Sequence, residues 1–380
     1  MLSSNKYNTF FIDTCIYDRF SCIIESGILE QLCQFKDSDV KILVTDTTHN
    51  ELVKHLSINI EKAIDKLKTA INKGRFHLLN ISADLIEIKN KIQDLESIEL
   101  IAENRILTYY KNIGADIIYA SDYLDISLLL KHYFKSLPPF ENSKDKKAEF
   151  PDAIALMTLE GWAQKNNKIV IVVTDDNGCK DFCNNSKWLH YENNLKNVIT
   201  SFQPKTYVTK FLNLISSIGH DALSEYLDND IKKAIIYNAE NSDIDIEANC
   251  HHEYEYDDTE IEYIGYDFLT DLCDLRHDII SIDNDKVVFQ VIVNIDCKIS
   301  ASFSFSIYDS FDKEHLHLGG NHYSINTKYE RTIIIELSGP YADNDLSKMR
   351  LSGIDISSNV IHIEFGEIDI YFSDDDYIND

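Results

Sequence analysis

Three short apolar runs in the first half of the chain most constrain its fold. The runs are Thr9–Ile12, Ile42–Val44 and Ile169–Val173. The first two lead through polar or acidic residues into helical patterns, and the third ends in Thr174, Asp175 and Asp176. The third run is β-branched throughout and does not alternate, which is typical of a strand buried on both faces of a parallel sheet. Strands that alternate with amphipathic helices indicate an α/β unit, which we expect over residues 1–205.

Four carboxylates of this half occupy similar places in the pattern. Each directly follows a strand or lies in the first turns of a helix, and they are Asp13, Glu51, Asp152 and Asp176. Taken singly, each is explained more simply as a helix cap or a surface charge. Functional groups of an open parallel sheet collect outside the carboxyl ends of its strands. We therefore expect the four acids to converge on one crevice.

Clustered carboxylates repel one another unless a positive charge lies among them. Hard oxygen ligands with bound water suit Mg²⁺ or Mn²⁺ better than zinc. One or two such ions can lower the pKa of a bound water and neutralise charge on a scissile phosphate. The pattern therefore predicts a divalent metal site and phosphodiester hydrolysis without a protein nucleophile.

Four sequence strings carry a family resemblance. They are Phe10–Cys15, Thr45–Leu52, Glu149–Ala153 and Val172–Asp176. In order and context they resemble the four acidic motifs of PIN-domain ribonucleases. They are most similar to a bacterial PIN-like branch marked by Glu-Phe-Pro-Asp-Ala and a long helical insertion. The resemblance covers residues 7–200 and implies a Rossmann-like parallel sheet and metal-dependent cleavage of RNA, often in toxin or antiphage defence roles.

By position, the resemblance makes Asp13, Glu51, Asp152 and Asp176 the metal-coordinating acids. Thr174 would be the small hydroxyl residue that precedes the last acid and hydrogen-bonds a ligand or water.

Some positions of the candidate site stay open. Asp175 is the alternative to Asp176, because successive strand residues point to opposite faces and only one of the pair would enter the site. Glu149 is either a secondary ligand or a loop charge. Cys15 stands where many PIN domains carry Asn or Ser, which removes a polar contact.

The segment between the second and third runs is mostly helical in pattern over residues 58–135. Apolar stripes run from Ile60 to Ile71 and from Leu85 to Ile98. The loop at residues 136–151 follows, and it carries Lys144, Lys146 and Lys147. These lysines would touch a phosphate backbone if the loop folds over the cleft, and otherwise they form a solvated loop.

The second half of the chain differs in charge and pattern. Residues 1–205 hold 25 Lys and Arg against 28 Asp and Glu, whereas residues 206–380 hold 11 against 36. We expect a helical and acidic connector at residues 206–262. Alternating apolar and polar residues then predict an acidic, mainly antiparallel β domain at residues 263–380. This domain would regulate the enzyme, bind a protein partner or mediate homo-oligomer assembly.

Several classes of protein are excluded or disfavoured. The longest apolar runs are far below the ~18 residues of a membrane span, and no export signal is apparent, so we expect a cytoplasmic protein with reduced cysteines and no membrane partner. The expected substrate is RNA, such as tRNA or mRNA. Two alternatives are a noncatalytic PIN-fold scaffold that binds RNA or protein, and a nuclease acting on DNA.

Overall fold

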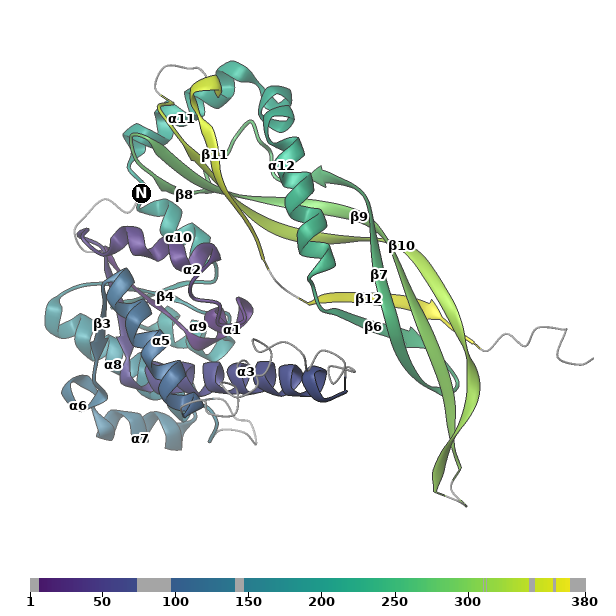
Figure 1. Ribbon diagram of the computed structural model, residues 1–380. Coiled ribbons are helices and arrows are strands. Elements are labelled where there is room, and N and C mark those ends of the chain that lie inside the picture. The colour runs from purple at the N-terminus through teal and green to yellow at the C-terminus, as the bar shows by residue number, and fades with distance from the viewer. Residues whose placement is uncertain are drawn as a thin grey trace, which may run out of the picture. The chain divides into compact units, whose positions relative to one another are not determined.

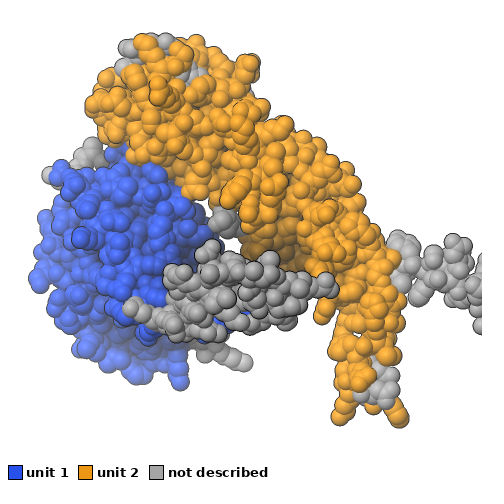
Figure 2. All heavy atoms as spheres, in the orientation of Figure 1, with its two compact units in different colours: residues 1–203 blue, residues 204–380 orange. Residues whose placement is uncertain are grey.

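The computed structural model divides the chain into two compact units, Met1–Gln203 and Pro204–Asp380 (Figure 2). It describes residues 7–73, 97–140, 147–309, 311, 313–341, 346–357 and 360–369. None of the helices in these ranges is long and apolar enough to cross a membrane.

The first unit is built on a five-stranded sheet in the order β3-β2-β1-β4-β5, with all neighbours parallel (Figure 1). Its strands are β1 (Thr9–Ile12), β2 (Lys41–Thr45), β3 (Ala115–Ile118), β4 (Val170–Val173) and β5 (Leu189–Glu192). All residues of the two central strands, β1 and β4, are buried. This confirms the predicted α/β unit with a parallel sheet.

Helices connect and cover these strands. They are α1 (Thr14–Arg19), α2 (Gly27–Glu30), the 3-10 helix η1 (Gln31–Phe35), α3 (Asp46–Lys73), α5 (Ile98–Ile113), α6 (Ala120–Tyr123), α7 (Ile126–Lys135), α8 (Phe150–Asn166), α9 (Asn177–Asn185) and α10 (Leu195–Ser201). Adjacent residues of β1 show that both faces of the sheet are covered. The Phe10 ring packs on Phe35 and Phe202, whereas Phe11 belongs to the core formed with Leu156 of α8 and Phe182 of α9.

The insertion differs from its predicted pattern in one respect. Residues 58–135 contain β3, although the sequence pattern there indicates mostly helix. This strand has only four residues and lies at an edge of the sheet, so it has no long buried run that would reveal it. Most of the apolar stripe between Leu85 and Ile98 lies outside the described residues, as do Lys144 and Lys146.

The second unit combines two helices with long antiparallel strands. Its main sheet follows the order β11-β10-β9-β7, and β8 also pairs with β9, while β6 and β12 form a separate parallel pair. The elements are α11 (Lys205–Ile218), α12 (His220–Glu240), β6 (Ile244–Asn249), β7 (Glu253–Phe268), β8 (Ile279–Ile282), β9 (Lys286–Asp309), β10 (Glu314–Ser338), the 3-10 helix η3 (Leu346–Lys348), β11 (Arg350–Ile356) and β12 (Ile361–Glu367).

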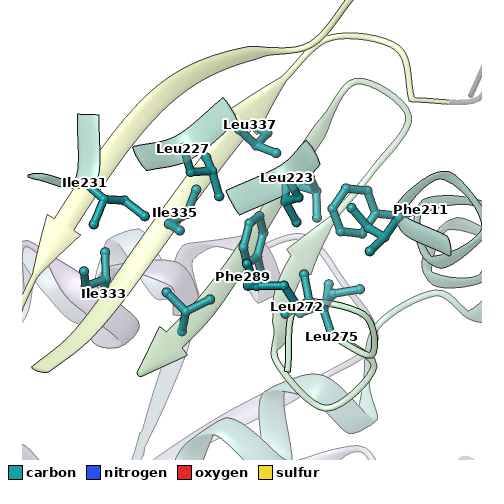
Figure 3. Packing of buried hydrophobic residues seen from close by; sticks show 14 of the residues in the cluster. Phe211, Leu223, Leu227, Ile231, Leu272, Leu275, Phe289, Ile333, Ile335 and Leu337 are labelled. Carbon is teal, nitrogen blue, oxygen red and sulfur yellow. The ribbon is translucent and has the colours of Figure 1, made fainter. Parts of the chain in front are cut away.

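A hydrophobic core joins α11 and α12 to one face of the main sheet (Figure 3). Phe289 of β9 is fully buried and its ring centroid lies 6.0 Å from that of Phe211 on α11. Alternate residues of β9, from Val287 to Val293, are buried in the same core. The period-two pattern of the sequence therefore corresponds to a helix-covered sheet face.

Residues 241–262, for which the sequence indicates an acidic connector, contain β6 and most of β7. Acids and tyrosines alternate here, and this alternation is itself a strand pattern. Tyr254 and Tyr256 pack on Phe303, whereas Glu253 and Glu255 on the other face are exposed.

Candidate active site

The carboxyl ends of β1 and β4 bring two predicted site residues into contact. These strands pair in parallel with Ile12 opposite Val173, so Asp13 and Thr174 follow them side by side. The Thr174 hydroxyl donates to Asp13 Oδ2 at 2.6 Å, and the Thr14 backbone N–H donates to Asp13 Oδ1 at 2.8 Å. Asp13 is only 8% exposed, and both of its oxygens have fixed partners. Its carboxylate is therefore held in one orientation.

Asp176 is tied to the same pair. Its backbone N–H donates to Thr174 Oγ1 at 3.1 Å, and its Oδ1 accepts from the Cys179 backbone N–H at 2.7 Å as the N-cap of α9. One oxygen thus stabilises the helix start, which leaves Oδ2 for other interactions. The negative charge of Asp176 also raises the pKa of Asp13, although burial is the larger cause.

Two helices carry the remaining predicted acids. Glu51 lies near the start of α3, where the Thr48 N–H donates to Thr45 Oγ1 at 3.1 Å. Asp152 lies in the first turn of α8, and α8 packs against α3. Burial raises the pKa of Glu51, and Asp13 raises it further.

Asp152 is the acid that the others affect most clearly. Burial and then the charges of Asp13, Glu51 and Asp176 raise its pKa to about 7. The structure therefore brings the four predicted acids into one electrostatic environment, from β1, α3, α8 and the segment after β4. Such mutual repulsion is expected of carboxylates that lie near one another.

The chemistry of these donors fits a hard divalent cation. All four are carboxylates, and a cation among them would relieve the repulsion that, after burial, raises the pKa values of Asp13, Glu51 and Asp152. Among the residues that the structure describes, no group of three or more His, Cys, Asp or Glu side chains is arranged so that it could hold a metal ion. The acids are thus close enough to interact, but their side chains do not form a closed ligand shell.

The other predicted residues lie around this cluster. Asp175 is exposed and forms an ion pair with Arg19, whereas Asp176 caps α9. Glu149 precedes α8 as its N-cap residue and contributes to the raised pKa of Asp152. Lys147 is exposed.

Three further residues lie beside the cluster, and the family resemblance singles out only Cys15 among them. Cys15 Sγ donates to Asp13 Oδ2 at 3.3 Å, so a thiol supplies a polar contact although Asn or Ser is absent. Cys179 is buried, and its pKa is raised by burial and then by Asp13. Arg19 ends α1 and holds Asp175. In the sequence, only the short helical spacing between Asp13 and Arg19 could have indicated that Arg19 lies near the site.

Comparison with known protein families supports the interpretation of the first unit as a PIN domain. Residues 10–179 match a family model described as a PIN domain, which spans Asp13, Glu51, Asp152 and Asp176. These residues form a PIN domain. No curated protein and no solved structure gave a significant match to the chain. PIN domains are generally metal-dependent nucleases, so the comparison supports a nuclease-type domain in the first unit and leaves the second unit unmatched.

Proposed function

We propose that the PIN domain is a metal-dependent endoribonuclease and that Asp13, Glu51, Asp152 and Asp176 hold its Mg²⁺ or Mn²⁺. The observation that carries the proposal is the effect of the other acids on Asp152: burial first, and then the charges of Asp13, Glu51 and Asp176, raise its pKa to about 7. Helix capping alone does not explain why acids from two strand ends and two helices share one electrostatic environment. A site that binds a divalent cation does explain it.

The chain's own residues supply orientation and charge. Thr174 fixes Asp13 through its hydroxyl and fixes Asp176 through the Asp176 backbone N–H. Thr174 is fully buried, so its hydrogen bonds do not compete with bulk water. A bound divalent ion would neutralise charge on the scissile phosphate and activate water. Glu51 on α3 and Asp152 on α8 would supply the remaining carboxylates of the site.

The decisive experiment measures cleavage of labelled tRNA, mRNA and single-stranded DNA by the purified full-length chain with Mn²⁺ or Mg²⁺. Asp13→Asn and Asp152→Asn should each abolish cleavage. Asp65→Asn, an exposed acid on α3, is the matched control and should leave cleavage unchanged. Cleavage that survives both site variants would refute the assignment. RNA binding without any cleavage would support the scaffold alternative, and cleavage of DNA alone would replace RNA as the substrate.

We extend the proposal to a toxin or antiphage role inside the cytoplasm. Induced expression of the wild type should then arrest growth and fragment cellular RNA, whereas Asp13→Asn should do neither. Normal growth with intact RNA at the same protein level would remove this role but would leave the activity in vitro open to the first experiment.

A further inference from the structure

We propose that Arg19 binds a phosphate of the RNA substrate and that Asp175 occupies its guanidinium group until RNA binds. The inference rests on the proposed nuclease function and adds a substrate contact to it. The four acids cannot supply this contact, because they repel a phosphate that no cation neutralises.

The position of Arg19 follows from the same strand ends that position the acids. Helix α1 begins directly after Asp13 and ends at Arg19. The Arg19 guanidinium forms an ion pair with Asp175, which directly precedes Asp176. The pair therefore joins the two segments that carry Asp13 and Asp176, and it lies beside the candidate active site.

Cys15 provides the physical link between this pair and the site. The Asp175 backbone N–H donates to Cys15 Sγ at 3.4 Å, and Cys15 Sγ donates to Asp13 Oδ2 at 3.3 Å. One side chain, Cys15, thus connects the pair to the carboxylate of Asp13. A phosphate held by Arg19 would therefore be bound beside the candidate active site.

The chemistry of the pair suits exchange with a phosphate. A guanidinium group presents a planar set of donors that matches a carboxylate and a phosphate equally well. The side chains of Arg19 and Asp175 are 41% and 46% exposed, so water and an incoming anion can reach both. Exposed ion pairs contribute little to stability, and exchange of one anion for another would therefore cost little.

A structural role makes a different prediction. As a tether, the pair would need both partners, and Arg19 would also stabilise the C-terminal end of α1 through its charge. Loss of either side chain would then have effects of the same sign. As a phosphate site, the pair predicts opposite signs, because removal of Asp175 frees Arg19 for RNA.

The test measures binding of fluorescein-labelled single-stranded RNA by anisotropy in Ca²⁺, with gel analysis to show that the RNA remains intact. Arg19→Ala should weaken binding about tenfold, which is typical of one lost charge-assisted hydrogen-bonded contact. Arg19→Lys should lie between wild type and Arg19→Ala, because lysine keeps the charge but not the bidentate geometry. Asp175→Asn should tighten binding about threefold.

The matched control is Arg105→Ala. Arg105 forms a comparable exposed pair with Glu25 in the same unit, with Nε–Oε1 and Nη2–Oε2 distances of 2.9 and 2.8 Å. This variant should bind RNA like the wild type. The salt dependence of binding should also decrease by about one phosphate contact in Arg19→Ala but not in Arg105→Ala.

Three outcomes would overturn the inference. If Arg19→Ala and Asp175→Asn both weaken binding, the pair is a structural tether. If Arg19→Ala binds like the wild type while the wild type binds RNA, Arg19 does not contact RNA, and the proposed nuclease function stands. If the wild type neither binds nor cleaves RNA, the proposed function fails and this inference fails with it.

Discussion

Replacement of Asp152 by asparagine should stabilise the metal-free protein and abolish its activity. The Asp152 side chain is half-buried near three other acids, and it makes no hydrogen bond to any residue that the structure describes. Asparagine has nearly the same shape but no charge. The substitution therefore removes repulsion without removing an observed hydrogen bond.

The magnitude follows from the pKa of Asp152, which burial and its acidic neighbours raise from 3.8 to about 7. Because the folded pKa lies above the unfolded one, the stability associated with the protonated group is fully present below pH 4 and is lost as the pH rises to about 7. At about 1.4 kcal/mol per pKa unit, the loss at pH 8 is about 2 to 4 kcal/mol. The lower value applies if the neighbouring acids share the proton.

The assay is differential scanning calorimetry of the chelated full-length chain at pH 4 and pH 8. Asp152→Asn should raise the melting temperature at pH 8 by roughly 5 to 15 °C for a unit of this size, and should change it little at pH 4. Mn²⁺ should stabilise the wild type more than the variant, because a ligand bound only by the native state raises its stability. Asp65→Asn should shift neither transition by more than about 1 °C.

Two results would refute the reasoning. One is a variant no more stable than the wild type at pH 8, which would mean that Asp152 is not repelled by its neighbours. The other is an equal gain at pH 4 and pH 8, which would mean that the gain does not come from charge.

Three further predictions concern the same unit. Thr174→Val should lower activity and reduce the free energy of unfolding by about 1 to 3 kcal/mol, because it leaves Asp13 Oδ2 without its 2.6 Å donor. Thr174→Ser should retain most of the activity and the stability, and equal activity of the two variants would contradict this prediction. Gly178→Ala should reduce stability by about 1 to 3 kcal/mol, measured by urea unfolding, because the added Cβ would lie 2.8 Å from Pro139 O. Gly265→Ala is the control and should be close to neutral, because no atom lies within 4 Å of its added Cβ. Cleavage rates should increase with pH up to about 7, where Asp152 ionises. Higher Mn²⁺ concentration should move this rise to lower pH, because the metal and the proton compete for the same carboxylates. A rise that does not depend on Mn²⁺ concentration would argue against this competition.

The acidic second half shows which strands can be predicted from a local sequence pattern and which cannot. Alternation in the sequence predicts the antiparallel strands from Lys286 onward, because one buried face requires a period of two. The same alternation is present in Glu253–Phe268, but most of its apolar positions are tyrosines and most of its polar positions are acids. Its pairing with β9 becomes evident only in three dimensions, where Tyr254 and Tyr256 pack on Phe303.

The sequence by itself determined the central strands of the first unit, their parallel arrangement and the four acids that follow them or begin helices. These features are local, since a buried strand needs a continuous apolar run and a parallel sheet places strand ends at one edge. Tertiary structure decided the edge strands β3 and β5, the different partners of Asp175 and Asp176, and the pairing of Arg19. It also decided the hydrogen bond between Thr174 and Asp13, which are 161 positions apart in the chain. Such contacts, and the burial that raises the pKa values of Asp13, Glu51 and Asp152, depend on how distant segments pack, and no local pattern encodes that packing.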